Sequence, residues 1–244
     1  MLNIVVPMAG KGSRFSKAGY LLPKPLIEIH GHPMIKYVIH NLRPKQQHRF
    51  IFLCLRDHIE RYKVDKLLQT WEPTCEIVIV EDITEGAACT VLFAKNLINN
   101  SQGLMIANSD QWVDVNIDMY LCTIELAKLD GLIMTMWAND PKWSYVRLNE
   151  KKEIVEVVEK KVVSNEATVG IYNFARGFDF VKAAERMIKK ELRVNGEYYV
   201  APAYNELLNL NKNIGYYNVG KEDNGMYGLG IPADLKKFRN SPIS

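Results

Sequence analysis

The stretch PMAGKGSRFSKAGYLLPKP, residues 7–25, concentrates positive charge and backbone freedom directly after an apolar run. It contains three glycines, four cations and no acidic residue. Glycines allow backbone N–H groups to converge on an anion with no side chain in the way. We therefore predict an anion-binding turn here, with Arg14 and Lys24 supplying charge. Neither G-x-x-x-x-G-K-[ST] nor G-x-G-x-x-G is present, since Phe15 stands at the third glycine position of the latter pattern.

Strand-like and helix-like segments alternate in the first half of the chain, which predicts βαβ units and a parallel sheet. The second half is richer in closely spaced strands, which predicts a mixed sheet that extends the first. The fold class is therefore α/β, with a Rossmann-like, mainly parallel central sheet flanked by helices. The glycine turn follows the first strand, and ligands bind at the carboxyl ends of strands in such sheets. Strands are expected at 2–7, 49–55, 75–81, 103–110, 131–137, 145–149, 153–160, 168–174 and 214–219, and helices at 33–42, 58–71, 86–98, 178–190, 202–210 and 232–238.

Composition excludes several classes of protein. The 244 residues carry a formal net charge of only +3, and the cations are dispersed, which argues against nucleic acid as a partner. No apolar run reaches the ~18 residues of a membrane helix and no charged leader precedes the first strand, so we expect a cytoplasmic protein without a membrane partner. The histidines lack H-E-x-x-H spacing, and the cysteines form no C-x-x-C pair and are expected to be free thiols. The cysteines are Cys54, Cys75, Cys89 and Cys122.

A longer set of ordered motifs resembles the sugar-phosphate nucleotidyltransferases, also called sugar-1-phosphate nucleotidylyltransferases. G-x-G-S-R-F is followed by P-K-P-L-I, as in that family. The resemblance extends over most of the chain and implies the nucleotide-diphospho-sugar transferase fold. It also implies a single domain over 1–244, with a nucleotide-binding half at about 1–130 and an acceptor-binding half at about 131–244. The other matching segments are PMIKYVIHNL (33–42), TEGAA (84–88), NSD (108–110), EK (159–160), GIYNF (170–174), GEYY (196–199) and GIPADLKKF (230–238).

The resemblance implies that a nucleoside monophosphate passes from an NTP to the phosphate of a small metabolite, with release of pyrophosphate. Arg14 would neutralise the departing phosphates, and Lys24 would lie between the acceptor phosphate and the α-phosphate. Asp110 would hold Mg²⁺, while Lys160 and Glu197 would bind the acceptor. The implied nucleotide-binding residues are Ala9, Gly10, Gly12, Ser13, Thr84, Gly86, Ala87 and Ser109.

Two departures from the family pattern concern the metal and the acceptor. Gly228 stands where the family usually has a second metal-binding aspartate. Asp223 and Asp114 are candidate substitutes, and spacing favours neither. Lys161 replaces the proline of the family's E-K-P segment.

The resemblance favours CTP slightly over UTP or dTTP, because the GAACT segment is similar to the cytidylyltransferase branch. The acceptor is either a sugar 1-phosphate or a phosphorylated amino acid such as phosphoglutamine, in the synthesis of surface-polysaccharide precursors of the capsule or lipopolysaccharide. A homodimer is the assembly that frequency alone favours.

Other classes of function stay open at this point. A nucleotide-binding regulator without catalytic activity would keep the glycine turn and lose the metal ligand. A dehydrogenase would need the glycine fingerprint that Phe15 interrupts, and a glycosyltransferase would be expected to carry a D-x-D motif, which the sequence lacks. Each residue also has a simpler interpretation: solvated loop cations at Arg14, Lys24 and Lys160, a turn or cap at Asp110, and a structural role at Glu197.

Overall fold

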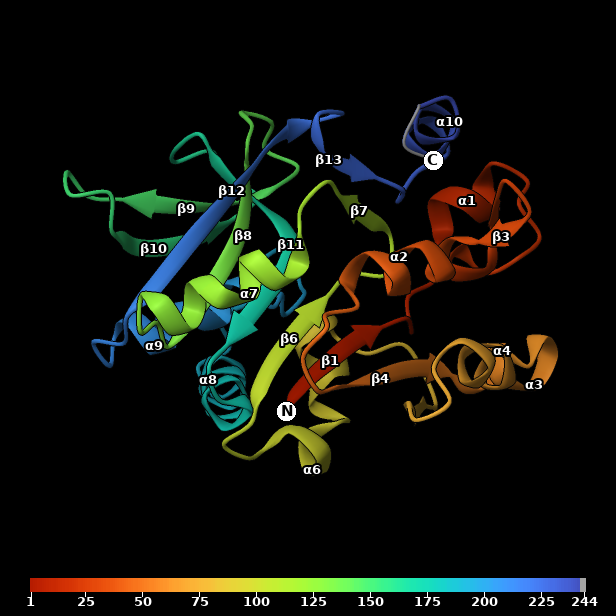
Figure 1. The fold of residues 1–244 in the computed structure, drawn as a ribbon, viewed down its shortest axis with the longest axis horizontal. Helices are drawn as coiled ribbons and strands as arrows, with labels where there is room; N and C mark the ends of the chain where they lie inside the picture. The colour runs from red at the N-terminus through yellow and green to blue at the C-terminus, as the bar shows by residue number, and fades with distance from the viewer. Residues whose placement is uncertain (242–244) are drawn as a thin grey trace.

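The computed structural model describes residues 1–241, and its main feature is one eleven-stranded sheet within that part of the chain (Figure 1). The N-terminal half supplies four parallel strands in the order β5-β4-β1-β6. Their bounds are Glu76–Val80 for β5, His48–Leu55 for β4, Leu2–Pro7 for β1 and Gly103–Ala107 for β6. Because these strands are parallel, their carboxyl ends meet at one edge of the sheet.

The C-terminal half continues the same sheet, as the sequence predicts. Strand β11 (Glu166–Phe174) pairs antiparallel with β6 and with β8 (Gly131–Trp137), and β12 (Ile214–Glu222) then lies parallel to β8. Two short strands, β13 (Gly225–Gly228) and β7 (Gln111–Val113), finish that edge. The hairpin of β9 (Ser144–Leu148) and β10 (Ile154–Glu159) attaches to β11. The mainly parallel α/β architecture is therefore confirmed, with mixed pairing in the C-terminal half.

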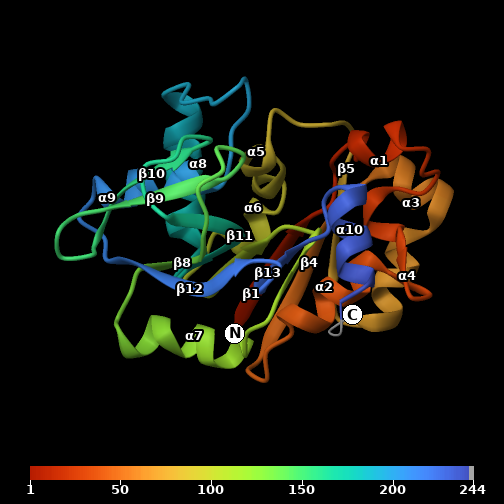
Figure 2. The same cartoon turned by 90° about the horizontal axis from the view of Figure 1, so that it is seen from above.

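Helices cover both faces of the sheet (Figure 2). On one face, the apolar sides of α5, α6, α8 and α9 pack on the sheet in one buried cluster. On the other face, α2, α4 and α7 form a second cluster. These helices are α2 (Met34–Leu42), α4 (Val64–Trp71), α5 (Ala87–Leu92), α6 (Lys95–Ile98), α7 (Ile117–Leu126), α8 (Gly177–Lys189) and α9 (Tyr204–Leu208).

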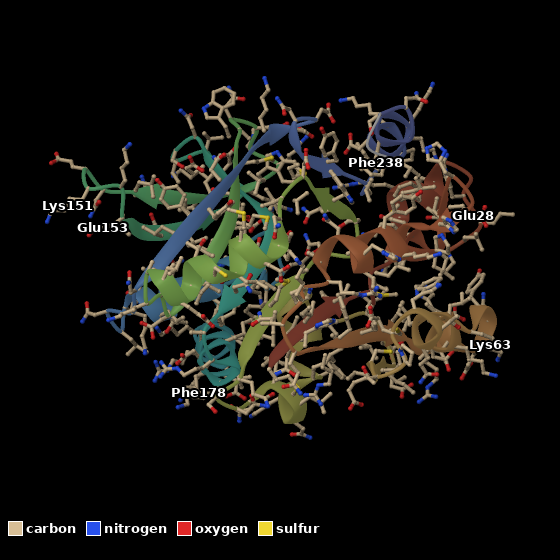
Figure 3. The ribbon with its side chains drawn as sticks, viewed as in Figure 1. Glu28, Lys63, Lys151, Glu153, Phe178 and Phe238 are labelled. Carbon is tan, nitrogen blue, oxygen red and sulfur yellow. The ribbon has the colours of Figure 1, made fainter. Side chains whose placement is uncertain are left out.

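A third, smaller apolar cluster joins the two chain ends. It contains Phe15 from α1 (Ser13–Lys17) and Phe238 from α10 (Pro232–Arg239), together with residues around the small antiparallel sheet of β2 (Glu28–Ile29) and β3 (His32–Pro33). Two short 3₁₀ turns, Lys24–Leu26 and Ala201–Ala203, lie in the connections. Figure 3 shows Lys63 at one end of the molecule and the β9–β10 turn, with Lys151 and Glu153, at the other.

The structure corrects three sequence predictions. The helix predicted at 58–71 is two helices, because α3 (Arg56–Tyr62) ends at Lys63, whose left-handed φ of 52° separates it from α4. The helix predicted at 86–98 is likewise divided into α5 and α6. Helix α7 was not predicted, although the Asn116 side chain caps it by accepting hydrogen bonds from the backbone N–H groups of Asp118 and Met119.

No helix among residues 1–241 is long and apolar enough to cross a bilayer.

Candidate active site

The turn after β1 and the turn after β6 lie together at the carboxyl edge of the sheet. The two strands are parallel neighbours, and β6 ends at Ala107, so Asn108–Asp110 face the glycine turn. Lys24 Nζ lies 2.9 Å from Asp110 Oδ2, although the two residues are 86 positions apart. The cation and the carboxylate predicted from the sequence therefore form one ion pair.

Phe15 fixes the glycine turn to the body of the protein. Its ring is buried, and it makes an edge-to-face contact with Tyr20 at a centroid distance of 5.1 Å. The backbone N–H groups of Phe15 and Ser16 donate to the carbonyl oxygen of Gly12 at 2.9 and 3.2 Å. The residue that interrupts the dinucleotide fingerprint is thus the apolar anchor of the turn.

A pocket of about 510 Å³ opens beside this ion pair, and we call it the glycine-turn pocket. It is lined by backbone and small side chains from three turns, by the Lys24–Asp110 pair and by Glu197. The lining residues are Pro7, Ala9, Gly10, Lys11, Ser13, Lys24, Ile83, Thr84, Gly86, Ala87, Thr90, Asn108, Ser109, Asp110 and Glu197.

The segment 84–88 is held against the segment 196–199 by main-chain contacts. The N–H of Tyr198 donates to the carbonyl of Glu85 at 2.8 Å, and the N–H of Ala88 donates to the carbonyl of Tyr198 at 3.0 Å. Gly86 has a φ of +133°, and a Cβ there would lie 2.4 Å from the carbonyl oxygen of Tyr198. Only glycine permits this approach, and the Thr84 hydroxyl holds the loop further by donating to the carbonyl of Gly86 at 2.9 Å.

A second pocket of about 280 Å³ adjoins the first, and we call it the Trp143 pocket. The two share Ala87 and Asn108. Its lining is rich in cations and in polar side chains from the β9–β10 hairpin and β11. The lining residues are Arg14, Ala87, Asn108, Gln111, Lys142, Trp143, Ser144, Glu159, Lys160, Thr168, Gly170, Tyr172, Tyr199 and Val200.

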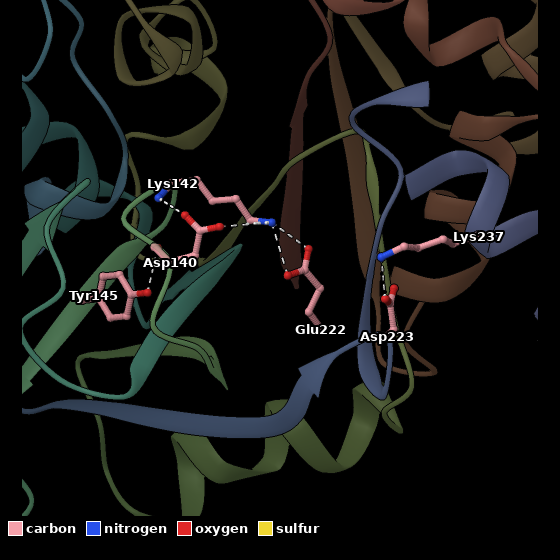
Figure 4. A network of polar contacts seen from close by, with 6 residues as sticks. All are labelled: Asp140, Lys142, Tyr145, Glu222, Asp223 and Lys237. Carbon is pink, nitrogen blue, oxygen red and sulfur yellow. Dashed lines mark hydrogen bonds and ion pairs between the residues drawn. The ribbon is translucent and has the colours of Figure 1, made fainter. Parts of the chain in front are cut away.

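Hydrogen bonds and ion pairs hold most of the charged groups of the Trp143 pocket. Lys160 Nζ donates to the Tyr199 hydroxyl at 2.7 Å, and the Ser144 hydroxyl donates to the Glu159 carboxylate. Lys142 Nζ lies 2.8 Å from Glu222 Oε1 (Figure 4). These contacts hold the side chains of Lys142 and Lys160 at the pocket.

Burial shifts the titration of the carboxyl group in this pocket. It raises the pKa of Glu159 above its usual value, while the Ser144 hydrogen bond and the Lys160 charge act in the opposite direction and Glu197 adds to the rise. Burial also raises the pKa of Tyr199, against the lowering influence of its hydrogen bond from Lys160. Burial therefore favours the neutral, protonated forms of Glu159 and Tyr199.

Comparison with known proteins now gives the family. The family model described as nucleotidyl transferase matches residues 4–208. The chain belongs to this nucleotidyl transferase family. The bifunctional protein GlmU of Aquifex aeolicus is 26% identical over an alignment of 258 positions, which covers 98% of this chain and 53% of that protein. GlmU of Methanococcus maripaludis strain C5 is 23% identical over an alignment of 262 positions, which covers 100% of this chain and 56% of that protein. The chain thus spans about half the length of these curated relatives.

A solved structure agrees with the family. The nucleoside-diphosphate-sugar pyrophosphorylase from Vibrio cholerae RC9 has a TM-score of 0.82 and 25% identity, and the match covers 98% of this chain and 100% of that chain. UDP-glucose pyrophosphorylase complexed with UDP-glucose has a TM-score of 0.79 at 16% identity, covering 98% and 97%, and shares the fold. The family and the fold predicted from the sequence motifs are both confirmed.

All but one of the nucleotidyl transferase residues predicted from the sequence line the two adjoining pockets. Ten line the glycine-turn pocket: Ala9, Gly10, Ser13, Lys24, Thr84, Gly86, Ala87, Ser109, Asp110 and Glu197. Arg14 and Lys160 line the Trp143 pocket with Ala87, and Gly12 lines neither. Arg14, predicted at the departing phosphates, therefore lines the same pocket as Lys160. Glu197, predicted at the acceptor, lines the same pocket as Lys24. The roles of these residues stay predictions.

Sequence reasoning missed several residues of the Trp143 pocket, namely Asn108, Gln111, Lys142, Trp143, Ser144 and Glu159. Three of them had an available signal. Asn108 and Gln111 flank the predicted Asp110 at the end of a strand, and Glu159 precedes the predicted Lys160. The segment 142–144 offered no such signal, because its place depends on the pairing of β9 with β11.

The Asp234 carboxylate borders the space that a side chain at Gly228 would fill. A Cβ at Gly228 would lie 3.2 Å from Asp234 Oδ2, and a Cβ at Gly230 would lie 2.5 Å from Asp110 Oδ2. Two carboxylates from different elements thus border neighbouring glycines of one segment. The Asp234 side chain makes no hydrogen bond or ion pair within residues 1–241, and burial and the charge of Glu222 raise its pKa.

The two substitutes considered from the sequence lie elsewhere. Asp223 pairs with Lys237 at 3.0 Å (Figure 4). The N–H of Asp114 donates to the carbonyl of Gly225, whereas the carbonyl of Asp110 accepts from the N–H of Leu229. The two aspartates therefore lie at opposite ends of the β7–β13 pairing, about 13 Å apart along the strand.

Residues 1–241 contain no group of three or more His, Cys, Asp or Glu residues that could hold a metal ion. Two carboxylates fit Mg²⁺ nonetheless, since that ion is often bound by one or two carboxylates together with substrate phosphates.

Proposed function

We propose that the chain transfers a nucleoside monophosphate from an NTP to the phosphate of a small metabolite and releases pyrophosphate. The observation that carries the proposal is the 2.9 Å ion pair between Lys24 and Asp110, which lies in the glycine-turn pocket beside the wall shared with the Trp143 pocket. We assign the NTP to the glycine-turn pocket and the acceptor to the Trp143 pocket.

The reaction needs charge neutralisation and alignment more than acid–base chemistry. An oxygen of the acceptor phosphate attacks the α-phosphorus of the NTP, and the bond from that phosphorus to the pyrophosphate oxygen breaks. A phosphate monoester is mostly dianionic at neutral pH, because its second pKa is near ~6, so the attacking oxygen needs no base. Lys24 meets the charge that develops around the α-phosphate, and preorganised cations of this kind stabilise the transition state.

Asp110 and Asp234 are the residues that would hold Mg²⁺, which when bound supplies positive charge to the triphosphate. In this proposal the Asp234 carboxylate replaces the aspartate that the family usually has at the position of Gly228. Support comes from the position of Asp234 Oδ2, 3.2 Å from where a Cβ of residue 228 would be. Release of Lys24 from Asp110 would then accompany metal binding, so that the ammonium turns to the phosphates.

The favoured substrates are CTP and a sugar 1-phosphate, with a phosphorylated amino acid such as phosphoglutamine as the second acceptor. A putative mannose-1-phosphate guanyltransferase of Sulfolobus acidocaldarius, 20% identical over 72% of this chain and 49% of its own length, supports a sugar 1-phosphate. The resemblance of GAACT to the cytidylyltransferase branch supports CTP. Synthesis of a surface-polysaccharide precursor would use such a product.

A matrix of four NTPs against several acceptor phosphates, read by pyrophosphate release with Mg²⁺, tests the proposal. We expect one NTP and one acceptor class to stand out, and Lys24→Ala to lower the rate by about 10²–10³-fold. Lys17→Ala is the matched control, since Lys17 is an exposed cation of the same segment that lines neither pocket. Nucleotide binding with no pyrophosphate release from any pair would instead indicate a regulatory protein.

A further inference from the structure

Two residues that line the same pocket each have a buried polar atom without a hydrogen-bond partner. Within residues 1–241, four buried side-chain atoms lack a partner, and two of them, Gln111 Oε1 and Trp143 Nε1, belong to residues that line the Trp143 pocket. Burying an unpaired polar atom destabilises a folded protein, so few such atoms persist without a reason. Their occurrence together in one 280 Å³ cavity points to a bound molecule that supplies the missing partners.

Burial and strand pairing hold the Gln111 amide at the Trp143 pocket. The side chain is only 8% exposed, and strand β7 fixes its backbone by pairing with β13. Gly170, at the irregularity in β11, has a φ of +80°, and a Cβ there would lie 2.5 Å from Gln111 Oε1 and 2.3 Å from Asn108 Nδ2. The missing side chain of Gly170 therefore leaves the space in which these two amide groups sit.

Most of the other polar side chains of the pocket already have partners in the protein. Lys160 is bonded to Tyr199, Ser144 to Glu159, and Lys142 to Glu222. Gln111 Oε1 can only accept a hydrogen bond, and Trp143 Nε1 can only donate one. A ligand that satisfies both must offer one hydrogen-bond donor and one acceptor, as a hydroxyl group or a carboxamide does.

We propose that Gln111 and Trp143 select acceptor phosphates that carry a neutral hydroxyl or carboxamide group, while Arg14 and Lys160 bind the phosphate itself. This inference rests on the proposed function, because it assigns the Trp143 pocket to the acceptor. A site built from unsatisfied buried groups rejects analogues that lack the matching group, since binding them leaves those groups unpaired.

The test compares three acceptors in the pyrophosphate assay: glucose 1-phosphate with hydroxyl groups, phosphoglutamine with a carboxamide, and propyl phosphate with neither. We expect kcat/KM of the wild type to favour one of the first two over propyl phosphate by at least about 10²-fold. Gln111→Met and Trp143→Phe each remove one hydrogen-bonding atom and keep most of the shape. Each should reduce that preference by about tenfold or more, with the KM of the NTP unchanged.

Stability supplies a second readout that does not depend on turnover. Gln111→Met should melt at the same temperature as the wild type or higher, because the unpaired oxygen is gone, whereas saturating acceptor should raise the melting temperature of the wild type more than that of the variant. Gln69→Met, on the exposed face of α4, is the matched control and should change neither measurement.

The outcomes separate the two proposals. Full retention of acceptor preference by both variants, in an enzyme that turns over, overturns the inference and leaves the proposed function standing. A marked drop in the melting temperature of Gln111→Met, without loss of preference in Trp143→Phe, also overturns it, because Gln111 would then be structural. Absence of turnover with every pair overturns the proposed function. In that case, a larger acceptor-dependent rise in melting temperature for the wild type than for Gln111→Met supports the inference, and equal rises overturn it.

Discussion

Gly170→Ala offers a direct test of how the site is built, because the chain contains a matched control. Gly170 and Gly31 have the same φ of +80°, but a Cβ at Gly31 meets nothing within 4 Å, whereas one at Gly170 meets both amide groups at 2.3 and 2.5 Å. Both substitutions place alanine in a left-handed conformation, at a cost of about 1–3 kcal/mol. Gly170→Ala must also displace Asn108 and Gln111, which adds about 1–3 kcal/mol for overpacking.

We therefore expect Gly170→Ala to lower the free energy of unfolding by about 2–6 kcal/mol and Gly31→Ala by about 1–3 kcal/mol. Urea denaturation of the two variants and the wild type measures this difference. In the pyrophosphate assay, Gly170→Ala should raise the KM of the acceptor, since Gln111 is moved, and Gly31→Ala should leave it unchanged. Equal losses of stability together with an unchanged acceptor KM would refute the reasoning, because the two amides would then not be held in place.

Further predictions concern the metal and the pH dependence. Asp234→Ala should weaken Mn²⁺ binding in the presence of NTP by about tenfold, measured by electron paramagnetic resonance. Adding Gly228→Asp to that variant should restore the Mn²⁺ affinity. Unchanged Mn²⁺ affinity in Asp234→Ala would contradict the assignment of Asp234 as a metal ligand. The raised pKa of Glu159 means that the native protein binds more protons than the unfolded chain between the usual glutamate pKa and the raised one. Stability should therefore fall as pH rises through that window, and Glu159→Gln should flatten this part of a denaturation midpoint profile between pH 4 and 8; an identical slope in the variant would show that Glu159 is not the group responsible.

The residues that the sequence identified are those whose signal is local. The glycine turn is a continuous motif after the first strand, and Asp110 follows the end of another strand, so the rule that parallel strands end at one edge brings Lys24 and Asp110 together. Helix α7 also had a local signal in the Asn116 cap, which was not used.

The rest of the site depends on contacts that no short pattern encodes. Gln111 faces the Trp143 pocket because β7 pairs with β13 and because β11 is irregular at Gly170. Asp234 reaches Gly228 only because the Phe238 side of α10 packs into the cluster that contains Phe15. The positions of Gln111 and Asp234 therefore depend on packing between distant parts of the chain. Strands β7 and β13 are more than 100 positions apart, and Phe15 and Phe238 are more than 200 positions apart.

Transfer of a labelled phosphate tests the central claim most directly. The wild type is incubated with Mg²⁺, acceptor and CTP, or whichever NTP the matrix selects, labelled either at the α- or at the γ-phosphate. Our account predicts that α-label appears in the acceptor product, that γ-label appears only in pyrophosphate, and that Lys24→Ala loses about 10²–10³-fold of this transfer. Appearance of γ-label in the acceptor, or equal transfer by wild type and Lys24→Ala, would contradict it.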